Sequence, residues 1–387
     1  MDFSLNDEQR LFRDTLRSFV EREIKPVARS YEQSGRYPTE IVAGLRELGL
    51  FGLVIPEEYG GLGADTVSFA LTFEEISRGW MGVAGVLGSH SVACWMLAKH
   101  GTEEQRTRFL PDLATGARRT GIALTEPGAG TDLQGITTTA RRDGDSYVVN
   151  GTKMWITNAR HADPLPVLVK TDPTAQPAHR GMSILLVEAG TPGFEVTADI
   201  GKLGYKGPES CEVVLTDVRV PAANLLGGTE GRGLQQALSA LETGRINIAA
   251  RGVGIAQRAY EEALDYARTR TAFGGPIGDF QAIQLRLAEI AVRLQSARLM
   301  TYWAASRMDD GVRMDTESGL AKIAASEAAL ACATDAMRIH GGYGYSTEFE
   351  IERLYRDAPL LSIGEGTNDV LRTVVAKALL AGRASIG

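Results

Sequence analysis

Two short segments, far apart in the chain, have the residue types of a ligand-binding and proton-transfer site. The segment from Ala123 to Asp132 reads Ala-Leu-Thr-Glu-Pro-Gly-Ala-Gly-Thr-Asp. Proline fixes one backbone angle there, and the glycines permit positive φ values and close backbone approach. Such a turn offers backbone N–H groups and the hydroxyls of Thr125 and Thr131 to a flat polar ligand. The alternative interpretation is an ordinary β-turn.

The second segment, Ile363-Gly364-Glu365-Gly366-Thr367, places one carboxylate between two glycines near the end of the 387-residue chain. Taken alone, a glutamate in such a loop is more often a solvated residue than a base. Together, the two segments have the parts for binding a flat ligand and moving a proton beside it.

The composition argues against several other kinds of site. The formal net charge of −7 argues against nucleic acid or an anionic membrane surface as the main partner. The five histidines are scattered, with no pair at metal-ligand spacing. Cys94, Cys211 and Cys332 are odd in number and far apart, so neither a disulfide framework nor a cysteine metal site is predicted. We expect buried thiols in a reduced compartment.

The N-terminal residues are acidic and lack both a cationic start and an apolar signal core. The segment from Gly79 to Ala98 has no charged residue, but its glycines, serines and histidine weaken it as a membrane-spanning helix. A buried helix of a globular core is the better interpretation. We therefore expect a cytoplasmic protein without membrane contact.

The elements that must position the two segments follow a helix–β–helix order. Residues 1–118 are predicted to form an N-terminal helical domain, in which Asp7 caps a helix whose apolar face includes Leu11 and Leu16 and ends before Pro26. Further helices are predicted at Thr39–Leu48, Asp65–Arg78, Val83–Lys99 and Glu103–Ala114.

Short β-branched runs predict a middle β domain over residues 119–228, as a small barrel or sandwich. Residues 142–145, Arg-Asp-Gly-Asp, are typical of a hairpin turn. The predicted strands are Thr137–Ala140, Tyr147–Asn150, Met154–Thr157, Val167–Lys170, Ser183–Val187 and Val213–Leu215.

Residues 229–387 return to a helical period and predict a C-terminal four-helix bundle, rich in alanine and leucine. The fold class is thus mainly α with a central β domain. The predicted helices are Gly233–Thr269, Asp279–Asp309, Thr316–His340 and Thr367–Leu380.

These segments together resemble the acyl-CoA dehydrogenase family, the flavoenzymes that desaturate acyl thioesters. The resemblance covers essentially the whole chain, and Ala123–Gly135 fits the first family signature at every constrained position. Arg338 stands where the second signature has glutamine, aspartate or glutamate. The rest of that signature is matched by Gly341-Gly342-Tyr343-Gly344, Glu348, Arg353 and Asp357.

The resemblance implies FAD as the cofactor. Thr125 would place a hydroxyl and a backbone N–H near the N1/O2/N5 edge of the flavin and tune how well it accepts a hydride. Trp155 and Thr157 would lie against the other side of the ring, the alternative for Trp155 being a place in the β-domain core. The residues implied around the ring are Ile122, Leu124, Thr125, Gly130, Thr131, Trp155 and Thr157.

In the family, part of the cofactor site comes from a neighbouring subunit, which implies a homotetramer built as a dimer of dimers. Arg270 would pair with the FAD pyrophosphate, a task suited to a guanidinium fork, and Phe273 and Gln281 would contact the same cofactor. Gly341 and Gly342 would allow the adenosine half to approach the backbone closely.

Three other positions complete the implied cofactor contacts. Thr367 and Asp369 would contact FAD after the base. Arg338 adds charge where the family has an amide or an acid, so it either grips a phosphate or is a surface arginine of the last helical turn.

Glu365 is implied as the catalytic base, which removes the α-proton of the thioester while a hydride leaves the β-carbon. Free glutamate has a pKa of about 4.3 and is a weak base. Burial beside an acyl chain raises its pKa. Donors on the thioester oxygen, among them the base's own backbone N–H, stabilise the developing enolate by roughly 3–4 kcal/mol each.

Some family branches place the base immediately before an arginine, at the position of Gly244 here, which cannot act as a base. Glu242 would bind the CoA portion or orient the loop, a purely structural role being the alternative. The substrate contacts implied are Thr131, Glu242, Arg245, Glu365 and Gly366.

The resemblance implies dehydrogenation of a short or branched acyl-CoA, with an electron-transferring flavoprotein as the electron acceptor, since the chain shows no second redox motif. A flavin oxidase or monooxygenase on the same fold, and a dehydrogenase acting on a carrier-protein thioester, remain alternatives. A non-catalytic acyl-CoA or acyl-carrier binding protein is a third.

Overall fold

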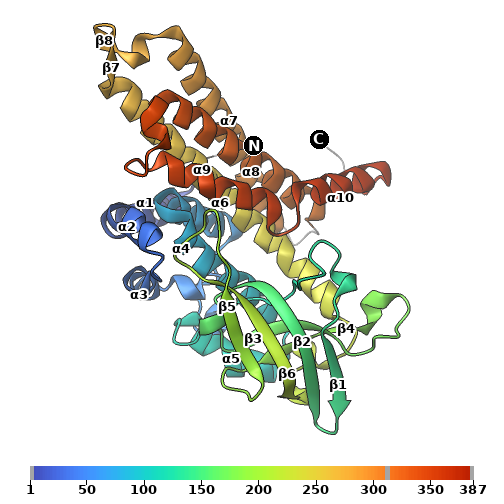
Figure 1. Ribbon diagram of the computed structural model, residues 1–387. Helices are drawn as coiled ribbons and strands as arrows, with labels where there is room; N and C mark the ends of the chain where they lie inside the picture. The colour runs from blue at the N-terminus through green and yellow to red at the C-terminus, as the bar shows by residue number, and fades with distance from the viewer. Residues whose placement is uncertain (1–3, 310–313, 384–387) are drawn as a thin grey trace.

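The computed structural model describes residues 4–309 and 314–383. The N-terminal helices and the β domain lie at one end of the molecule, and the C-terminal helices extend away from them (Figure 1). The long helix α6 (Gly233–Thr269) runs from the β domain into the far end of the bundle and packs on both α4 and α8. It therefore connects the parts of the chain that carry the predicted site residues.

The predicted fold class is confirmed: helices flank a central sheet on both sides in sequence. The α-helices besides α6 are α1 (Asp7–Phe19), α2 (Lys25–Ser34), α3 (Thr39–Glu47), α4 (Thr66–His100), α5 (Glu103–Ala114), α7 (Gln281–Asp309), α8 (Asp315–His340), α9 (Ile351–Ile363) and α10 (Asn368–Leu380). The strands are β1 (Thr139–Asp143), β2 (Ser146–Thr157), β3 (Leu165–Lys170), β4 (Met182–Val187), β5 (Phe194–Asp199), β6 (Ser210–Pro221), β7 (Thr271–Ala272) and β8 (Gly275–Pro276).

The first helix differs from its prediction at both ends. Asn6, not Asp7, is the N-cap, because Asn6 and Gln9 form a reciprocal capping box and leave Asp7 in the first turn. A π-helical turn (Val20–Ile24) leads from α1 into α2, and Pro26 is tolerated in the first turn of α2 because its missing N–H needs no acceptor there. Leu11, predicted for the apolar face, is 71% exposed.

The uncharged segment lies in α4, which joins the two helices predicted there. Trp80 breaks the helix with φ −161° and ψ 114°, between the two predicted spans. The most apolar window of α4 is long enough to cross a membrane, but 83% of it is buried inside the molecule. The helix is thus a core element, as its glycines and polar residues predict.

The six strands β1–β6 form one sheet in the order β4-β3-β1-β2-β6-β5, in which β1 and β3 are parallel and the other neighbours antiparallel. The predicted hairpin turn is confirmed, with Asp143 paired to Ser146. Two predicted strands merge into β2. Strand β5 escapes prediction because it is mostly exposed and polar, so it has no clear apolar alternation.

The bundle rests on close contact between α6 and α8. A Cβ at Gly252 of α6 would lie 2.7 Å from the carbonyl oxygen of Ala325 in α8. The absence of a side chain at Gly252 therefore allows the two helix backbones to approach closely. Helix α6 has the predicted bounds. Helix α9 was not predicted: it is short, contains Pro359 and carries several charged residues.

Candidate active site

The glycine-rich turn from Ala123 is held in place by a buried carboxylate. Glu126 and Ala129 exchange backbone hydrogen bonds across the turn, at 2.8 and 3.2 Å. The Glu126 carboxylate accepts from the backbone N–H groups of Thr137 and Thr138 and from Lys153 Nζ at 2.8 Å. Burial acts to raise the pKa of Glu126, but Lys153 and the threonines outweigh it and lower that pKa to about 2. The carboxylate therefore fixes the turn in its charged form.

The same turn is tied to the strand that carries the predicted aromatic contact. The backbone N–H of Met154 donates to the carbonyl of Thr125 at 2.8 Å, next to Trp155. Trp155 has φ +65° and is 53% exposed, so the alternative interpretation as a core residue is wrong. Thr125 and Thr157 are half-buried, and Gly130 and Thr131 are exposed. The indole of Trp155 and the glycine-rich turn are thus accessible to a ligand.

Glu365 lies in a short loop whose geometry is constrained from both ends. Helix α9 ends at Ile363, and Thr367 caps α10 by accepting from the N–H of Val370. Between them Glu365 has φ +56° and Gly366 has φ +89°. A left-handed conformation at a glutamate costs of order 1–3 kcal/mol and persists only where surrounding structure enforces it. Such strain is characteristic of functional sites.

The Glu365 carboxylate meets α6 at Gly244. A Cβ on Gly244 would lie 2.5 Å from Glu365 Oε2, so the absence of a side chain there makes room for the carboxylate. Oε2 is inaccessible to solvent and has no hydrogen-bond partner among the described residues. Burial raises the pKa of Glu365, and the positive charges of Arg245, Arg251 and Lys322 oppose that rise. The group is a carboxylate with an unused lone pair and enhanced basicity.

Lys322, which sequence reasoning missed, holds the loop of the base. Its Nζ donates to the carbonyl of Gly366 and to Asn368 Oδ1, both at 2.8 Å, and the residue is fully buried on α8. Burial lowers the pKa of Lys322 to about 8, while the charge of Glu365 acts to raise it. A signal was present in the sequence: one lysine interrupts an apolar, alanine-rich stretch of the helix.

The residues before and after Gly244 face the start of α8. Glu242 Oε2 accepts from the backbone N–H of Met314 at 3.3 Å, and burial together with the nearby Asp315 raises the pKa of Glu242. Arg245 Nη1 lies 3.5 Å from Asp315 Oδ1, and Arg245 is buried. The predicted substrate contacts Glu242 and Arg245 therefore adjoin the base on one helix.

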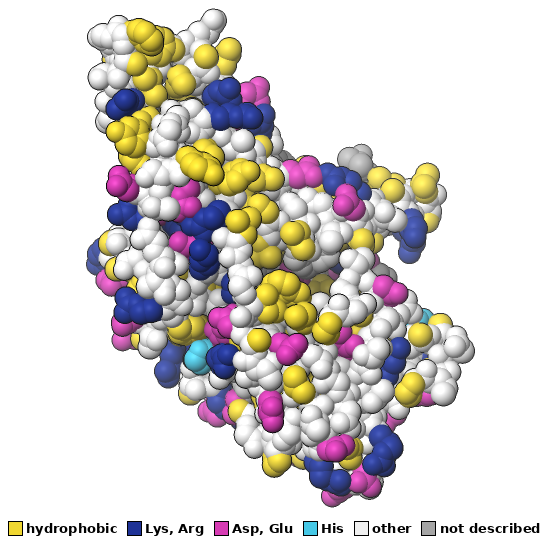
Figure 2. All heavy atoms as spheres, in the orientation of Figure 1, with side chains coloured by type: hydrophobic (Ala, Val, Ile, Leu, Met, Phe, Trp, Pro, Cys, Tyr) yellow, Lys and Arg dark blue, Asp and Glu magenta, His cyan; other side chains and the backbone are white. Residues whose placement is uncertain are grey.

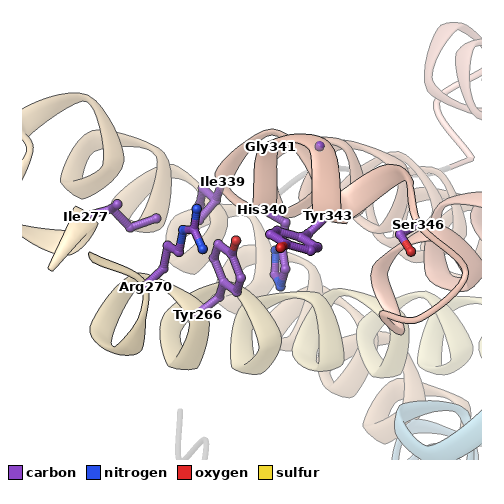
Figure 3. Close-up of a pocket in the computed structure, with 9 residues that line it drawn as sticks. Tyr266, Arg270, Ile277, Ile339, His340, Gly341, Tyr343 and Ser346 are labelled. Atoms are coloured by element: carbon purple, nitrogen blue, oxygen red, sulfur yellow. The ribbon is translucent and has the colours of Figure 1, made fainter. Parts of the chain in front are cut away.

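A cavity of about 550 Å³ lies at the opposite end of α6 (Figure 3). Tyr266 of α6 and Arg270, the residue that follows this helix, face His340 and Tyr343, with the Arg270 guanidinium 5.5 Å from the Tyr343 ring centre. The predicted residues Gly341 and Gly342 line the same cavity, and a Cβ at either would meet no atom within 4 Å. A bare backbone opposite a guanidinium fits the diphosphate and adenosine portion of a dinucleotide.

The other cofactor residues predicted for this region do not line the cavity. Phe273 is 99% exposed at the tip of the β7–β8 hairpin and contacts Phe280 edge to face. Gln281 is exposed at the start of α7. Arg338 does not line the cavity, and its exposed side chain pairs with Asp335 at 3.3 Å.

Asp369, at the start of α10, is exposed and lies 3.5 Å from Arg372. The three cysteines are buried and form no disulfide, as expected. Residues 4–309 and 314–383 contain no group of histidine, cysteine, aspartate and glutamate side chains suited to a metal ion.

The base and the cavity are too far apart in one chain to hold the same dinucleotide. Gly244 and Arg270 are separated along α6 by a helix length of about 39 Å, which exceeds an extended dinucleotide. Within one subunit, therefore, the structure brings the base together with Gly244, Arg245 and Glu242, and it brings Arg270 together with Gly341 and Gly342. It does not bring these two groups together.

Comparison with known proteins matches this arrangement over the whole chain. The N-terminal, middle and C-terminal domains of acyl-CoA dehydrogenase match residues 6–117, 121–218 and 231–380. The probable acyl-CoA dehydrogenase YngJ of Bacillus subtilis is 43% identical over 98% of this chain and all of its own length. The bovine (Bos taurus) mitochondrial short-chain specific acyl-CoA dehydrogenase is 40% identical over 97% of this chain and 91% of its own.

The fold comparison agrees with the sequence comparison. The butyryl-CoA dehydrogenase of Megasphaera elsdenii superposes with a TM-score of 0.95 at 37% identity, over 98% of this chain and 100% of that one. The chain belongs to the acyl-CoA dehydrogenase family, the FAD-dependent oxidoreductases that desaturate acyl-CoA thioesters.

Proposed function

We propose that this protein dehydrogenates a short acyl-CoA thioester to its trans-2-enoyl-CoA, with Glu365 removing the α-proton. The observation that carries the proposal is the buried Oε2 of Glu365, which has no partner within the described residues and faces Gly244 of α6. Burial raises the pKa of this carboxylate and thereby strengthens it as a base.

Glu365 also has the group needed to stabilise the enolate. Its backbone N–H donates to no acceptor in the described parts of the chain, and the left-handed conformations of Glu365 and Gly366 set its direction. A preorganised donor on a developing oxyanion is worth roughly 3–4 kcal/mol. We assign this N–H to the thioester oxygen and the carboxylate to the α-proton. Glu242 then serves the CoA end, and Arg245 lies beside the base at the thioester end.

FAD, when bound, supplies the acceptor for the hydride that leaves the β-carbon. Thr125, Trp155 and Thr157 would hold the flavin ring, with Ile122, Leu124, Gly130 and Thr131 around it. Thr367 and Asp369 would contact the cofactor beyond the base. Arg270, Phe273, Gln281, Gly341 and Gly342 would hold the remainder of a cofactor whose ring lies in another subunit, and whether Arg338 also does so is part of the same proposal.

A shared cofactor site requires an oligomer, which we propose to be a homotetramer. Helix α7 supports an interface, because Leu285 and Val292, one heptad apart, are 62% and 63% exposed, and Leu299 follows at 36%. Figure 2 shows hydrophobic side chains gathered on the surface over the same end of the bundle. Exposed apolar stripes of this kind mark protein–protein contacts.

We propose domain limits at residues 1–118, 119–228 and 229–387.

We further propose a cytoplasmic location and an electron-transferring flavoprotein as the electron acceptor. Because Trp155 is exposed, a flavin held beside it would be accessible to a brief redox contact, which is usually small and salt-sensitive.

An anaerobic titration of the flavin-loaded protein with acyl-CoA thioesters tests the proposal. Bleaching of the flavin by a short acyl-CoA is the expected result, and lack of bleaching by every acyl-CoA would contradict it. A parallel reaction in air should produce little hydrogen peroxide without an added acceptor. Rapid substrate-dependent peroxide formation would instead indicate an oxidase.

A further inference from the structure

A row of buried polar atoms without partners lies on α6 beside the base. Thr243 Oγ1, Asn247 Oδ1 and two nitrogens of Arg251, Nε and Nη2, have no hydrogen-bond partner within the described residues. All three side chains are more than nine-tenths buried, at 3%, 3% and 6% exposure. Residues four and eight positions apart share one face of a helix. The row therefore follows one side of α6, starting next to Gly244.

Helix α4 has glycines, which carry no side chain, opposite this row. A Cβ at Gly88 would collide with the Asn247 amide, and a Cβ at Gly85 would collide with the hydroxyl of Tyr205. The Arg251 guanidinium carbon lies 5.2 Å from the centre of the Tyr205 ring. Polar groups thus replace apolar side chains in what is otherwise an aliphatic core between α4 and α6.

Arg251 differs from the other buried arginines of α6 in its charge balance. Arg258 is paired with Glu262 at 2.8 Å, and Arg245 approaches Asp315 at 3.5 Å. Arg251 has no ion pair in the described parts of the molecule, and its guanidinium packs against the ring of Tyr205. An uncompensated buried charge is strongly destabilising. A ligand carboxylate that reached Arg251 would supply the missing hydrogen-bonded partner.

Arg251 also lies close enough to Glu365, the proposed base, to interact with its charge. Its charge acts to lower the pKa of Glu365, so the two groups are within electrostatic range. Gly244, which touches the Glu365 carboxylate, precedes Arg251 by seven residues, or about 10.5 Å along the helix on nearly the same face. Helical side chains lean toward the N-terminus, which is the direction of Gly244 from Arg251.

We infer that Arg251 binds a carboxylate at the far end of the acyl chain, so that the substrate is a short dicarboxylic acid held as its mono-thioester. This inference rests on the proposed function, which places the α-carbon beside Glu365. The helix distance, shortened by the reach of the arginine, suits an acyl chain of about four or five carbons. A guanidinium fork binds a carboxylate through two parallel hydrogen bonds, and the ligand would satisfy the nitrogens that are now without partners.

The test compares matched thioesters in anaerobic flavin bleaching. Succinyl-CoA and glutaryl-CoA are set against butyryl-CoA, pentanoyl-CoA and the methyl ester of glutaryl-CoA, which keeps the length and loses the charge. For the unaltered protein we expect kcat/KM for one of the carboxylated thioesters to exceed that of the neutral ones by at least about 100-fold, because a neutral chain leaves Arg251 unpaired.

Substitution of Arg251 tests whether this residue causes the preference for carboxylated thioesters. Arg251→Gln should bring the ratio of kcat/KM for carboxylated over neutral thioesters close to one, and Arg251→Lys should keep part of the preference. Arg258→Gln is the matched control, a buried arginine of the same helix with its own carboxylate partner, and it should leave the preference unchanged.

Each outcome decides between the two proposals. If butyryl-CoA bleaches the unaltered protein as fast as glutaryl-CoA and succinyl-CoA, or if Arg251→Gln slows all thioesters equally, the inference is wrong and the proposed dehydrogenation stands. If no thioester bleaches the flavin, the proposed function itself fails. Should Arg251→Gln not fold, the comparison of glutaryl-CoA with its methyl ester on the unaltered protein still decides.

Discussion

The carboxylate of Glu365 occupies the space that a side chain on Gly244 would need. A Cβ at Gly244 would lie 2.5 Å from Oε2 and 2.9 Å from Cδ of Glu365. Helix α6 and the loop after α9 thus meet at the Glu365 carboxylate. The space between them holds one side chain, either at position 365 or at position 244, but not both.

Gly244→Ala should displace the base. The added methyl group must push the carboxylate aside, and a misplacement of about 1 Å costs up to about 100-fold in rate. We expect the rate of anaerobic flavin bleaching to fall by about 10- to 100-fold with flavin content unchanged. Gly364→Ala is the control, because its φ is −68° and its nearest neighbour would be 3.6 Å away. An unchanged rate in Gly244→Ala would contradict the geometry.

Glu365→Gln should keep the fold and the flavin but lose proton abstraction, with a fall in the bleaching rate of at least about 1000-fold. In the unaltered protein the rate should rise with pH through the raised pKa of Glu365, because only the carboxylate form accepts a proton. Stopped-flow rates from pH 5 to 9 check both statements. Bleaching by the variant at the original rate would remove Glu365 from the mechanism.

The same substitution should also change the pH dependence of stability. The pKa of Glu365 is raised on folding, so its stabilising contribution is present below the unfolded value of about 4.3 and is lost as pH rises through the folded value. Glu365→Gln should therefore be more stable than the unaltered protein at pH 8 and lose this advantage near pH 4. Urea unfolding at equal flavin occupancy measures the difference.

Lys322→Met should act on the base without touching the substrate. It leaves the Gly366 carbonyl and Asn368 Oδ1 without their donor, at a cost of about 1–3 kcal/mol in stability. It also removes a charge that lowers the pKa of Glu365, so the pH profile of bleaching should move to higher pH. The exposed Lys377→Met should move neither quantity. A profile that stays in place would limit Lys322 to a structural role.

Arg270→Ala should lose flavin and weaken the oligomer together, because the proposed cofactor contact crosses a subunit boundary. Loss of a ligand that binds only the native state also lowers Tm. Flavin absorbance per subunit and sedimentation measure both effects. Arg268→Ala, also exposed at the end of α6 but outside the cavity, should retain flavin and assembly. Full flavin occupancy in Arg270→Ala would refute the contact.

Local sequence patterns predicted the elements that are long and periodic. Helix α6 was predicted with its observed bounds because the helical period continues over its whole length without a proline. The start of α1 was misplaced by one residue, because the amide of Asn6 and the carboxylate of Asp7 are both good caps and only the partner Gln9 decides between them. Short or exposed elements such as β5 and α9 carry too little apolar alternation to predict.

The contacts that make the site could not be predicted in the same way. Glu365 was identified from its motif, but its contact with Gly244 depends on the packing of α9 and α10 against α6 and α8. Lys322 carried a signal, a charge within an apolar helix, yet its acceptors lie in another segment. Likewise, the missing partners of Arg251 become visible only when every neighbour has a position.

The length of α6 also has a genetic consequence. In the proposed assembly each site combines Glu365 of one subunit with Arg270 of the next. A subunit carrying Glu365→Gln still supplies an intact Arg270, and a subunit carrying Arg270→Ala still supplies an intact Glu365. Co-expressed in one cell, the two inactive alleles would assemble into mixed oligomers in which one of two paired sites has both residues intact. Two loss-of-function alleles of this gene would then complement each other.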